Sequence, residues 1–563
     1  MRLAPSPNPL PQGEGVAPVL LLILLATLLR FGFAWALGLG VDESYMVAAG
    51  RALRLGYFDH PPAAWWMQWG AAHLFGTEAP VAVRAPFILA FALSTWLMAR
   101  LGTAVAGPRA GVWAAIALTL SPVFGVTTGT WVLPDGPLDC ALLGAALCLV
   151  HALPARGPGV AAWWGGAGLC AGLALFSKYT AVLTIGGAFA YLLTSPAHRR
   201  WLARPHPYLA ALLALAVFSP VIAWNAAHHW ASFAFQGERA AGLRFHPWQP
   251  FAVVVGEALF VLPWIWLAMM LAVIGALTRR ANAATSPARR ERWRRSPLPL
   301  AGEVGKRSLP GEGLLCWLAA PPILAFSLVA LWSGGRVLYH WAAPGYLILF
   351  PLLGAWLAER PRFARTGAVL TAGFVLVALT ALCTQVRLDW MRPALARSHG
   401  RDPDLEAIDW TSLRRDLDSR GLLSASTVVG VPDWRDAGKI AYALGPGVTV
   451  TCLNADARQF GFVAPAASFV GRDLLVLAPE HPERVVAALA PSFAGLQPLA
   501  PAPIRHAGRV LAEVAAVRGR LVAWPPQPQA SAYASPLPAG SRSSAQLSPP
   551  SPVPNTSPHL DAK

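Results

Sequence analysis

Long runs of apolar residues, separated by short polar segments, fill most of the chain up to about residue 386. Each run is close to the ~20 residues that a helix needs to cross a bilayer. The pattern predicts an α-helical polytopic membrane protein with about eleven transmembrane helices. The predicted spans are 17–40, 81–100, 111–127, 137–153, 160–176, 179–194, 207–224, 251–277, 314–333, 342–358 and 367–386.

Beyond the last span the pattern changes to that of a small soluble domain. Residues 405–422 and 483–490 have helical spacing, and 426–431, 448–453 and 473–478 are short strand-like runs. Helices that alternate with buried strands predict a small α/β layer. The expected division of the chain is a flexible segment at 1–16, a membrane domain at 17–386, an α/β domain at 387–524 and a disordered Pro/Ser-rich tail at 525–563.

Composition agrees with the pattern. The chain is 55% hydrophobic and 13% charged, whereas soluble domains carry about 25% charged residues. A water-soluble enzyme, a disordered chain and a fibrous protein are therefore excluded. The net charge of +17 does not indicate a nucleic-acid binder, because most basic residues lie in short loops between apolar runs. The six cysteines, five of them in apolar runs, show no disulfide framework and no metal-binding spacing.

The basic residues also predict the orientation. With the N-terminus inside the cell, most Lys and Arg of the short loops fall on the inner side, as the positive-inside rule requires. The largest contribution comes from a predicted basic insertion at 278–313. With eleven spans, the α/β domain then lies outside the cytoplasm.

The predicted outer loops carry the candidate chemistry. The first loop, 41–80, opens with Asp42 and Glu43 directly after the first span. Two adjacent carboxylates at a membrane surface need water or a partner to stay ionised. They could be a solvated helix end, or a general base that faces a cleft at the bilayer boundary. The same loop contains GYFDHPP at 56–62, in which a lone His60 is more often structural than catalytic.

Four further outer loops add polar groups. Asp135 precedes an apolar run and could be a helix N-cap or line the same cleft. Lys178 could extend to the membrane surface or contact a phosphate. The loop from Asn225 to Arg244 contains two histidines, and the loop at 336–340 contains Arg336 and His340. Cations at this depth could stabilise a departing lipid-linked phosphate while a carboxylate receives an acceptor's proton.

Taken in order, these motifs resemble those of bacterial membrane glycosyltransferases. The Asp42-Glu43 pair, GYFDHPP (56–62), LPDGPL (133–138), FSKYTAVL (176–183) and WNAAHHWASFAFQ (224–236) are similar to the family 39-like enzymes of the GT-C superfamily. These are related to protein O-mannosyltransferases and to the lipid A aminoarabinose transferase. The resemblance covers roughly residues 17–350. The chain differs from the aminoarabinose transferases, which carry a Lys where it has Asp59-His60.

The resemblance implies a polyprenyl-phosphate sugar donor and inverting transfer of a hexose or pentose on the periplasmic side. The family's usual catalytic acid falls on Asp42, with Glu43 beside it, and the second acid falls on Asp135. The phosphate-side Lys falls on Lys178. The site expected from the motifs and the resemblance therefore comprises catalytic Asp42, Glu43 and Asp135; donor phosphate-binding Lys178 and Arg336; and substrate-binding Tyr57, Asp59, His60, Asn225 and His340.

The acceptor stays open between lipid A, another envelope glycan, a lipid and a protein. No metal site is predicted: Asp42, Glu43 and His60 could bind a divalent cation, but their spacing matches no defined site. The expected location is the bacterial inner membrane, with membrane lipids as neighbours and no nucleic acid as partner. The alternatives are a polytopic transporter or lipid flippase, or an assembly protein whose C-terminal domain binds a partner.

Overall fold

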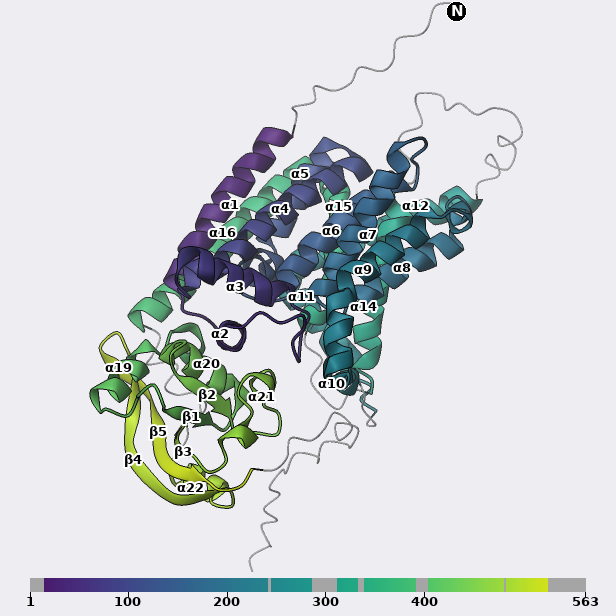
Figure 1. Cartoon of the computed structure of the whole chain (residues 1–563). Coiled ribbons are helices and arrows are strands. Elements are labelled where there is room, and N and C mark those ends of the chain that lie inside the picture. Colours follow the sequence, from purple (N-terminus) through teal and green to yellow (C-terminus); the bar gives the residue numbers. More distant parts are fainter. Residues whose placement is uncertain are drawn as a thin grey trace, which may run out of the picture.

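The computed structural model describes residues 15–240, 245–285, 311–332, 339–390, 404–479 and 482–524. Figure 1 shows a bundle of helices with a smaller, sheet-containing unit at one end. Four predictions lie wholly or largely outside the described residues: the N-terminal segment, most of the 278–313 insertion, Arg336 and the tail from 525.

In the described part of the chain, eight helices are long and apolar enough to cross a membrane. A helix satisfies its own backbone hydrogen bonds, which lipid cannot do, so the protein is a multi-pass membrane protein. The eight are α1 (Val16–Ala36), α4 (Pro80–Ala106), α6 (Asp135–Ala152), α7 (Gly159–Ser177), α9 (His206–Ala227), α14 (Glu312–Val329), α15 (Ala343–Ala358, with the 3-10 turn η4, Tyr339–Ala342, before it) and α16 (Pro361–Leu388).

The predicted count of eleven spans is not confirmed, although every predicted span contains a helix. The span expected at 251–277 is two helices, α11 (Gln249–Val261) and α12 (Pro263–Thr285), which meet at a bend of 108°. Counting this pair as one span gives nine. The spans expected at 111–127 and 179–194 contain short helices, α5 (Pro108–Leu120) and α8 (Ala181–Thr194). A π-helical stretch, η1 (Val123–Thr128), follows α5 and explains why its apolar run is longer than its helix.

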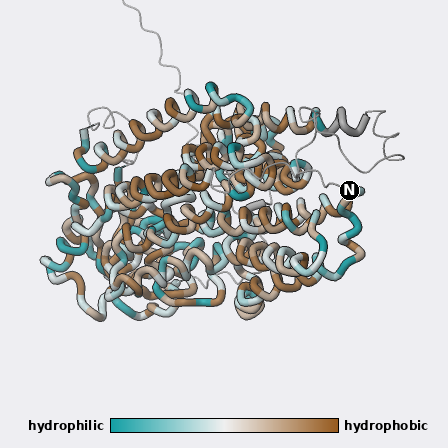
Figure 2. The backbone as a smooth tube through the Cα atoms, turned by 90° about the horizontal axis from the view of Figure 1, so that it is seen from above, coloured by the Kyte–Doolittle hydropathy of each residue, from teal (hydrophilic) through white to brown (hydrophobic). Residues whose placement is uncertain are grey.

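The apolar residues of the bundle face outward as well as inward. Figure 2 shows hydrophobic residues along the lengths of the helices. Large side chains such as Leu24 and Leu28 on α1 and Val369 and Leu370 on α16 are exposed in the protein alone. Such faces are stable only against lipid or another apolar surface.

Three short helices lie between the spans and the sheet. The first outer loop folds into α2 (Val41–Ala49) and α3 (Ala63–Phe75), and α10 (Ala231–Ala240) follows α9. The 3-10 turn η2 (Arg199–Ala203) joins α8 to α9 at the opposite end of the bundle (Figure 1).

The C-terminal unit is a five-stranded mixed sheet in the order β2-β1-β3-β5-β4. β1 is parallel to β2 and β3, whereas β5 is antiparallel to β3 and β4. The strands are β1 (Val428–Val431), β2 (Thr449–Cys452), β3 (Asp473–Ala478), β4 (Phe493–His506) and β5 (Arg509–Leu521). The helices are α18 (Asp404–Ala407), α19 (Thr411–Ser419), α20 (Trp434–Leu444), α21 (Phe460–Val463) and α22 (Pro482–Leu489), with a 3-10 turn η5 (Ala466–Phe469).

The three strands predicted from apolar runs are confirmed as β1, β2 and β3. The hairpin of β4 and β5 was not predicted. β4 contains Pro498, Pro501 and Pro503, which argue against a central strand. The structure places β4 at the edge of the sheet with irregular register, where missing N–H donors are tolerated.

Candidate active site

Glu43, at the start of the first outer loop, is buried and accepts hydrogen bonds from three other parts of the chain. Its side chain is buried, and Arg84 of α4 donates to both of its oxygens, at 2.8 Å to Oε1 and 2.6 Å to Oε2. The backbone N–H groups of Gly40 and Val132 each donate to it at 2.9 Å. Burial alone would raise the pKa of Glu43, but Arg84 and the two N–H groups lower it below the ordinary value. Glu43 is therefore an ionised anchor that joins α2, α4 and the 131–133 loop.

Arg84 extends this anchor to the end of the first span. It also donates to the carbonyl oxygens of Ala34, Leu37 and Gly38, at 3.2, 2.9 and 2.7 Å. These are carbonyls that the end of α1 leaves without helical partners. The Glu43–Arg84 pair therefore fixes how the chain leaves α1 and enters α2.

Asp42, one residue before Glu43, has a different environment from the buried Glu43. It is exposed to solvent, and no hydrogen bond to its carboxyl is found within the described ranges. Although its carboxyl reaches solvent, the surrounding protein removes part of its hydration, and this desolvation raises the pKa of Asp42 against the opposing positive charges of Arg458 and Arg435. A carboxylate with a raised pKa that stays open to solvent is suited to accept a proton.

A second carboxylate, Asp59, lies beside Asp42. Asp59 is buried, and burial raises its pKa while Arg458 opposes the rise. Its Oδ2 lies 3.7 Å from the Arg458 guanidinium. Its Oδ1 is buried and accepts no hydrogen bond from the described residues. The hydroxyl of Tyr45 also interacts with the Asp59 carboxyl, and burial raises the pKa of Tyr45 well above its ordinary value.

A second charged cluster lies where α6 begins and α7 ends. Lys178 donates to Asp135 Oδ1 at 2.8 Å, and both side chains are buried. Asp135 is the first residue of α6 rather than its N-cap, which is Pro134. His340 and His60 are both close enough to interact electrostatically with Asp135. The segment 59–60 thus connects the two clusters, with Asp59 toward Asp42 and His60 toward Asp135.

Two predicted substrate-binding residues make local structural contacts. The Tyr57 ring is fully buried and stacks on Trp65 with centroids 4.4 Å apart, and its hydroxyl donates to the Ala52 carbonyl. Burial raises the pKa of Tyr57 to about 12. Asn225, also fully buried, donates to the Val221 carbonyl at 3.0 Å and accepts from the Phe233 N–H at 3.3 Å. Both side chains are therefore engaged in contacts within the protein, and their predicted role in substrate binding stays a prediction.

The sequence did not identify Arg458 as part of this region. Arg458 lies in the α/β domain, about 400 positions after Asp59 and Asp42. The one local sign of a special role is structural: its φ of 49° is left-handed, which is uncommon for a residue other than Gly. No motif in the surrounding NADARQFGFV segment (454–463) would have identified it.

The residues considered for a divalent cation are not gathered as ligands. Within the described residues there is no group of three His, Cys, Asp or Glu placed to hold a metal. The Glu43 oxygens face Arg84 and two backbone N–H groups instead.

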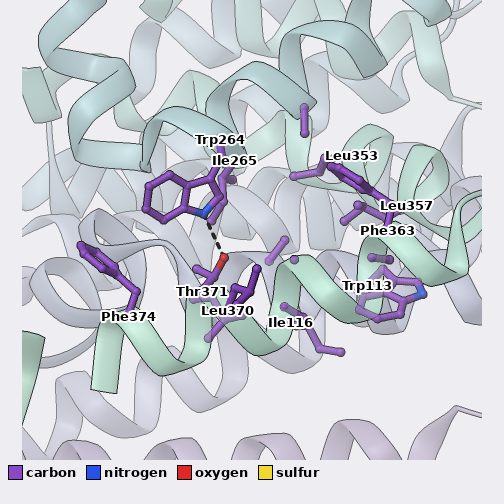
Figure 3. Close-up of a pocket in the computed structure, with 16 residues that line it drawn as sticks. Trp113, Ile116, Trp264, Ile265, Leu353, Leu357, Phe363, Leu370, Thr371 and Phe374 are labelled. Atoms are coloured by element: carbon purple, nitrogen blue, oxygen red, sulfur yellow. Dashed lines mark hydrogen bonds between the residues drawn. The ribbon is translucent and has the colours of Figure 1, made fainter. Parts of the chain in front are cut away.

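An apolar cavity of about 420 Å³ lies apart from the charged clusters, between α5, α12, α15 and α16. Figure 3 shows Trp264, Phe374 and Trp113 around it, with the Trp264 indole donating to Thr371 Oγ1 at 2.9 Å. None of the predicted site residues lines this cavity.

The fold and the site define a class: a polytopic membrane protein with charged residues at one end of its helix bundle, covered by an α/β domain. Residues 59–224 match the family model described as dolichyl-phosphate-mannose-protein mannosyltransferase. This segment contains Asp59, His60, Asp135 and Lys178, and it ends before the α/β domain. None of the curated protein sequences matches the chain.

The structure is similar to that of ArnT from Cupriavidus metallidurans. Against the apo state the TM-score is 0.60 with 14% identity, and the match covers 90% of this chain and 98% of ArnT. Against ArnT bound to undecaprenyl phosphate the TM-score is 0.55 with 16% identity, at the same coverage. At these identities the likeness establishes the fold alone, which is that of ArnT. The resemblance predicted from the motifs is thus confirmed for the fold and for the 59–224 segment.

Proposed function

We propose that this protein is an integral membrane glycosyltransferase. It moves a monosaccharide, a hexose or a pentose, from a polyprenyl-phosphate donor to an acceptor at the end of the bundle where the α/β domain lies. The observation that carries the proposal is the solvent-open Asp42, held by the Glu43–Arg84 anchor at the end of a membrane span. The ArnT fold, solved with undecaprenyl phosphate bound, supports the donor class.

The proposed reaction is a single inverting displacement. The acceptor hydroxyl oxygen attacks C1 of the sugar while Asp42 takes the hydroxyl proton. The bond between C1 and the phosphate oxygen breaks, and both electrons leave with the polyprenyl phosphate. Lys178 balances the charge that develops on that phosphate. Because both oxygens of Glu43 are already engaged, we assign Glu43 to positioning Asp42 rather than to proton transfer.

In the proposed donor site, the buried pair of Lys178 and Asp135 fixes the position of the Lys178 ammonium. An ammonium paired with one carboxylate is held in place before the donor arrives, with His60 and His340 close to that carboxylate. We assign Asp135 to holding Lys178, and His60 and His340 to substrate contacts. Arg336 remains a proposed second phosphate contact from the sequence.

The basic residues at the ends of the helices support an orientation of the protein in the membrane. Arg100 and Arg109 flank the α4–α5 turn, and Arg156 lies between α6 and α7. These turns belong to the end of the bundle opposite α2. We therefore propose that the basic end is cytoplasmic, as the positive-inside rule requires, and that Asp42 and the α/β domain are periplasmic in a bacterial inner membrane.

The direct test is transfer from a labelled polyprenyl-phosphate sugar by the purified protein in proteoliposomes, with hexose and pentose donors compared. Envelope lipids and glycans from cells with and without the gene, examined by mass spectrometry, identify the acceptor among lipid A, another glycan, a lipid or a protein. Movement of the labelled donor across vesicles without sugar transfer would instead indicate a flippase or transporter.

Lys178→Ala is expected to raise the KM for the donor by about 10- to 100-fold, because a charge-assisted phosphate contact is worth about 1.5–3 kcal/mol. The KM for the acceptor is expected to change little. Steady-state kinetics with each substrate varied in turn measures both values.

The control for this variant tests the effect on Asp135, the buried partner of Lys178. Lys178→Ala leaves the Asp135 carboxylate buried without its cation, so Lys178→Ala combined with Asp135→Asn tests whether folding rather than donor binding is affected. A larger effect on the acceptor than on the donor would contradict the phosphate role.

A further inference from the structure

The α/β domain is packed into the first outer loop as if both were one unit. Lys439 of α20 is buried and donates to three carbonyl oxygens: that of Leu39, just before α2, at 2.6 Å, and those of Glu406 and Ile408 at 3.0 and 2.8 Å. Gly438 beside it approaches Tyr45 of α2 so closely that a Cβ there would lie 2.8 Å from the Tyr45 Cα. The domain therefore has a fixed position on α2 (Figure 1).

The segment next to Arg458 continues this contact toward the candidate site. The N–H of Gln459 donates to the Tyr45 hydroxyl at 2.9 Å, and its Oε1 accepts from the Phe58 N–H at 2.9 Å. Tyr45 packs edge-on against Trp434 of the domain, with centroids 5.2 Å apart. Arg458 is consequently placed against the loop that carries Asp59, and its own backbone has little freedom to move away.

Two aromatic rings and two carboxylates surround the Arg458 guanidinium. It lies 4.1 Å from the ring centroid of Trp434 and 4.9 Å from that of Phe235. Its closest carboxylates are Asp456 at 3.3 Å, which is half exposed, and Asp59 at 3.7 Å. The aromatic faces stabilise the guanidinium without neutralising it, and Asp59 is the buried carboxylate of its two ion pairs.

Resting on the proposed function, we propose that the α/β domain is part of the active site, because it supplies Arg458 as the positioning residue that pairs with the buried Asp59 next to the base Asp42. Asp59 is buried and Asp42 adds a second negative charge near it, so Asp59 needs a cation to stay ionised. Arg458 acts through Asp42 and does not itself contact the reacting atoms.

The charged groups around the two carboxylates support this role. Asp42 faces Arg458 and Arg435 on the positive side and Glu43 and Glu406 on the negative side, with Arg458 the stronger of the two cations. Arg435 has a side chain that is 59% exposed, so water screens it. Asp59 faces Arg458, the Tyr45 hydroxyl and Asp42. Without Arg458 one proton would be shared between the two carboxyls, and the base would be lost over part of the working pH range.

The test compares Arg458→Gln with Arg458→Lys in the full-length protein, with kcat/KM for sugar transfer measured from pH 5 to pH 9. Arg458→Gln should move the acidic limb of the profile to higher pH by about one unit, because the pKa of Asp42 rises when its main cation is removed. Arg458→Lys keeps the charge and should restore most of the wild-type profile. Arg520→Gln is the matched control, since Arg520 is an exposed arginine of the same domain that contacts Gly471 and Asp473.

The outcomes separate this inference from the proposed function. The inference is supported if the acidic limb shifts to higher pH in Arg458→Gln but stays near its wild-type position in Arg458→Lys and in Arg520→Gln. Thermal unfolding of the variants must also be unchanged. An active wild type whose profile does not move in Arg458→Gln, or a uniform loss at every pH in both Arg458 variants, overturns the inference alone. A wild type with no transfer from any polyprenyl-phosphate sugar overturns the proposed function.

Discussion

Replacing Asp42 with asparagine is expected to lower sugar transfer by about 10³-fold, since general-base catalysis contributes typically 10²–10⁴-fold. Asparagine has the same shape as aspartate but cannot take a proton. Asp42 makes no hydrogen bond that the described structure requires for folding, so the variant should insert and unfold like the wild type. Transfer from a labelled donor in proteoliposomes measures the loss, and turnover at the wild-type rate would refute the assignment.

The same residue predicts a pH dependence. Partial loss of hydration raises the pKa of Asp42 above its ordinary value, and only the ionised form can act as a base. Transfer should therefore fall as the pH drops through that raised pKa and be independent of this group at higher pH. An acidic limb at the ordinary aspartate pKa, near 3.9, would show that Asp42 is fully solvated and not in the environment described here.

Breaking the Glu43–Arg84 pair is expected to have the largest effect on stability. Glu43→Gln keeps the side-chain shape but leaves the Arg84 charge buried without its carboxylate, which costs about 3–5 kcal/mol. Both side chains are nearly inaccessible, with exposures of 3% and 1%. Unfolding in detergent by heat or denaturant, followed in purified protein, measures the loss.

A second ion pair in the same loop provides the matched control. Arg51 binds Glu78 with two hydrogen bonds of 2.8 Å, the same bidentate geometry, but these side chains are 22% and 23% exposed. Glu78→Gln is therefore expected to cost about 1 kcal/mol or less. Equal losses in Glu43→Gln and Glu78→Gln would show that burial of the Glu43–Arg84 pair does not decide the stability of this loop.

Local patterns predicted much of the membrane fold. Runs of about twenty apolar residues identified α1, α4, α6, α7, α9, α14, α15 and α16, because lipid allows few other ways to cross a bilayer. The same patterns did not reveal the 108° bend between α11 and α12. Hydropathy measures how apolar a segment is, whereas a bend depends on what packs against it.

The sequence could not predict the different roles of the neighbouring acids Asp42 and Glu43. Asp42 and Glu43 are adjacent and chemically almost equivalent in the sequence, yet one is open to solvent and the other is enclosed by Arg84 and two backbone N–H groups. Lys178 and Asp135 were both predicted, but not that they form a pair. Which partner a charged group finds is set by α4, α6 and α7 coming together.

The sequence by itself determined that this is a multi-pass membrane protein with acids and cations beside its spans, because helix length and apolar content follow directly from the bilayer. It also determined the strands β1 to β3 by their apolar runs. Only the tertiary structure decided that Arg458, from the far end of the chain, joins Asp42 and Asp59. The physical reason is that charge interactions depend on distance in space and on exclusion of water, and neither quantity is encoded in any short stretch of residues.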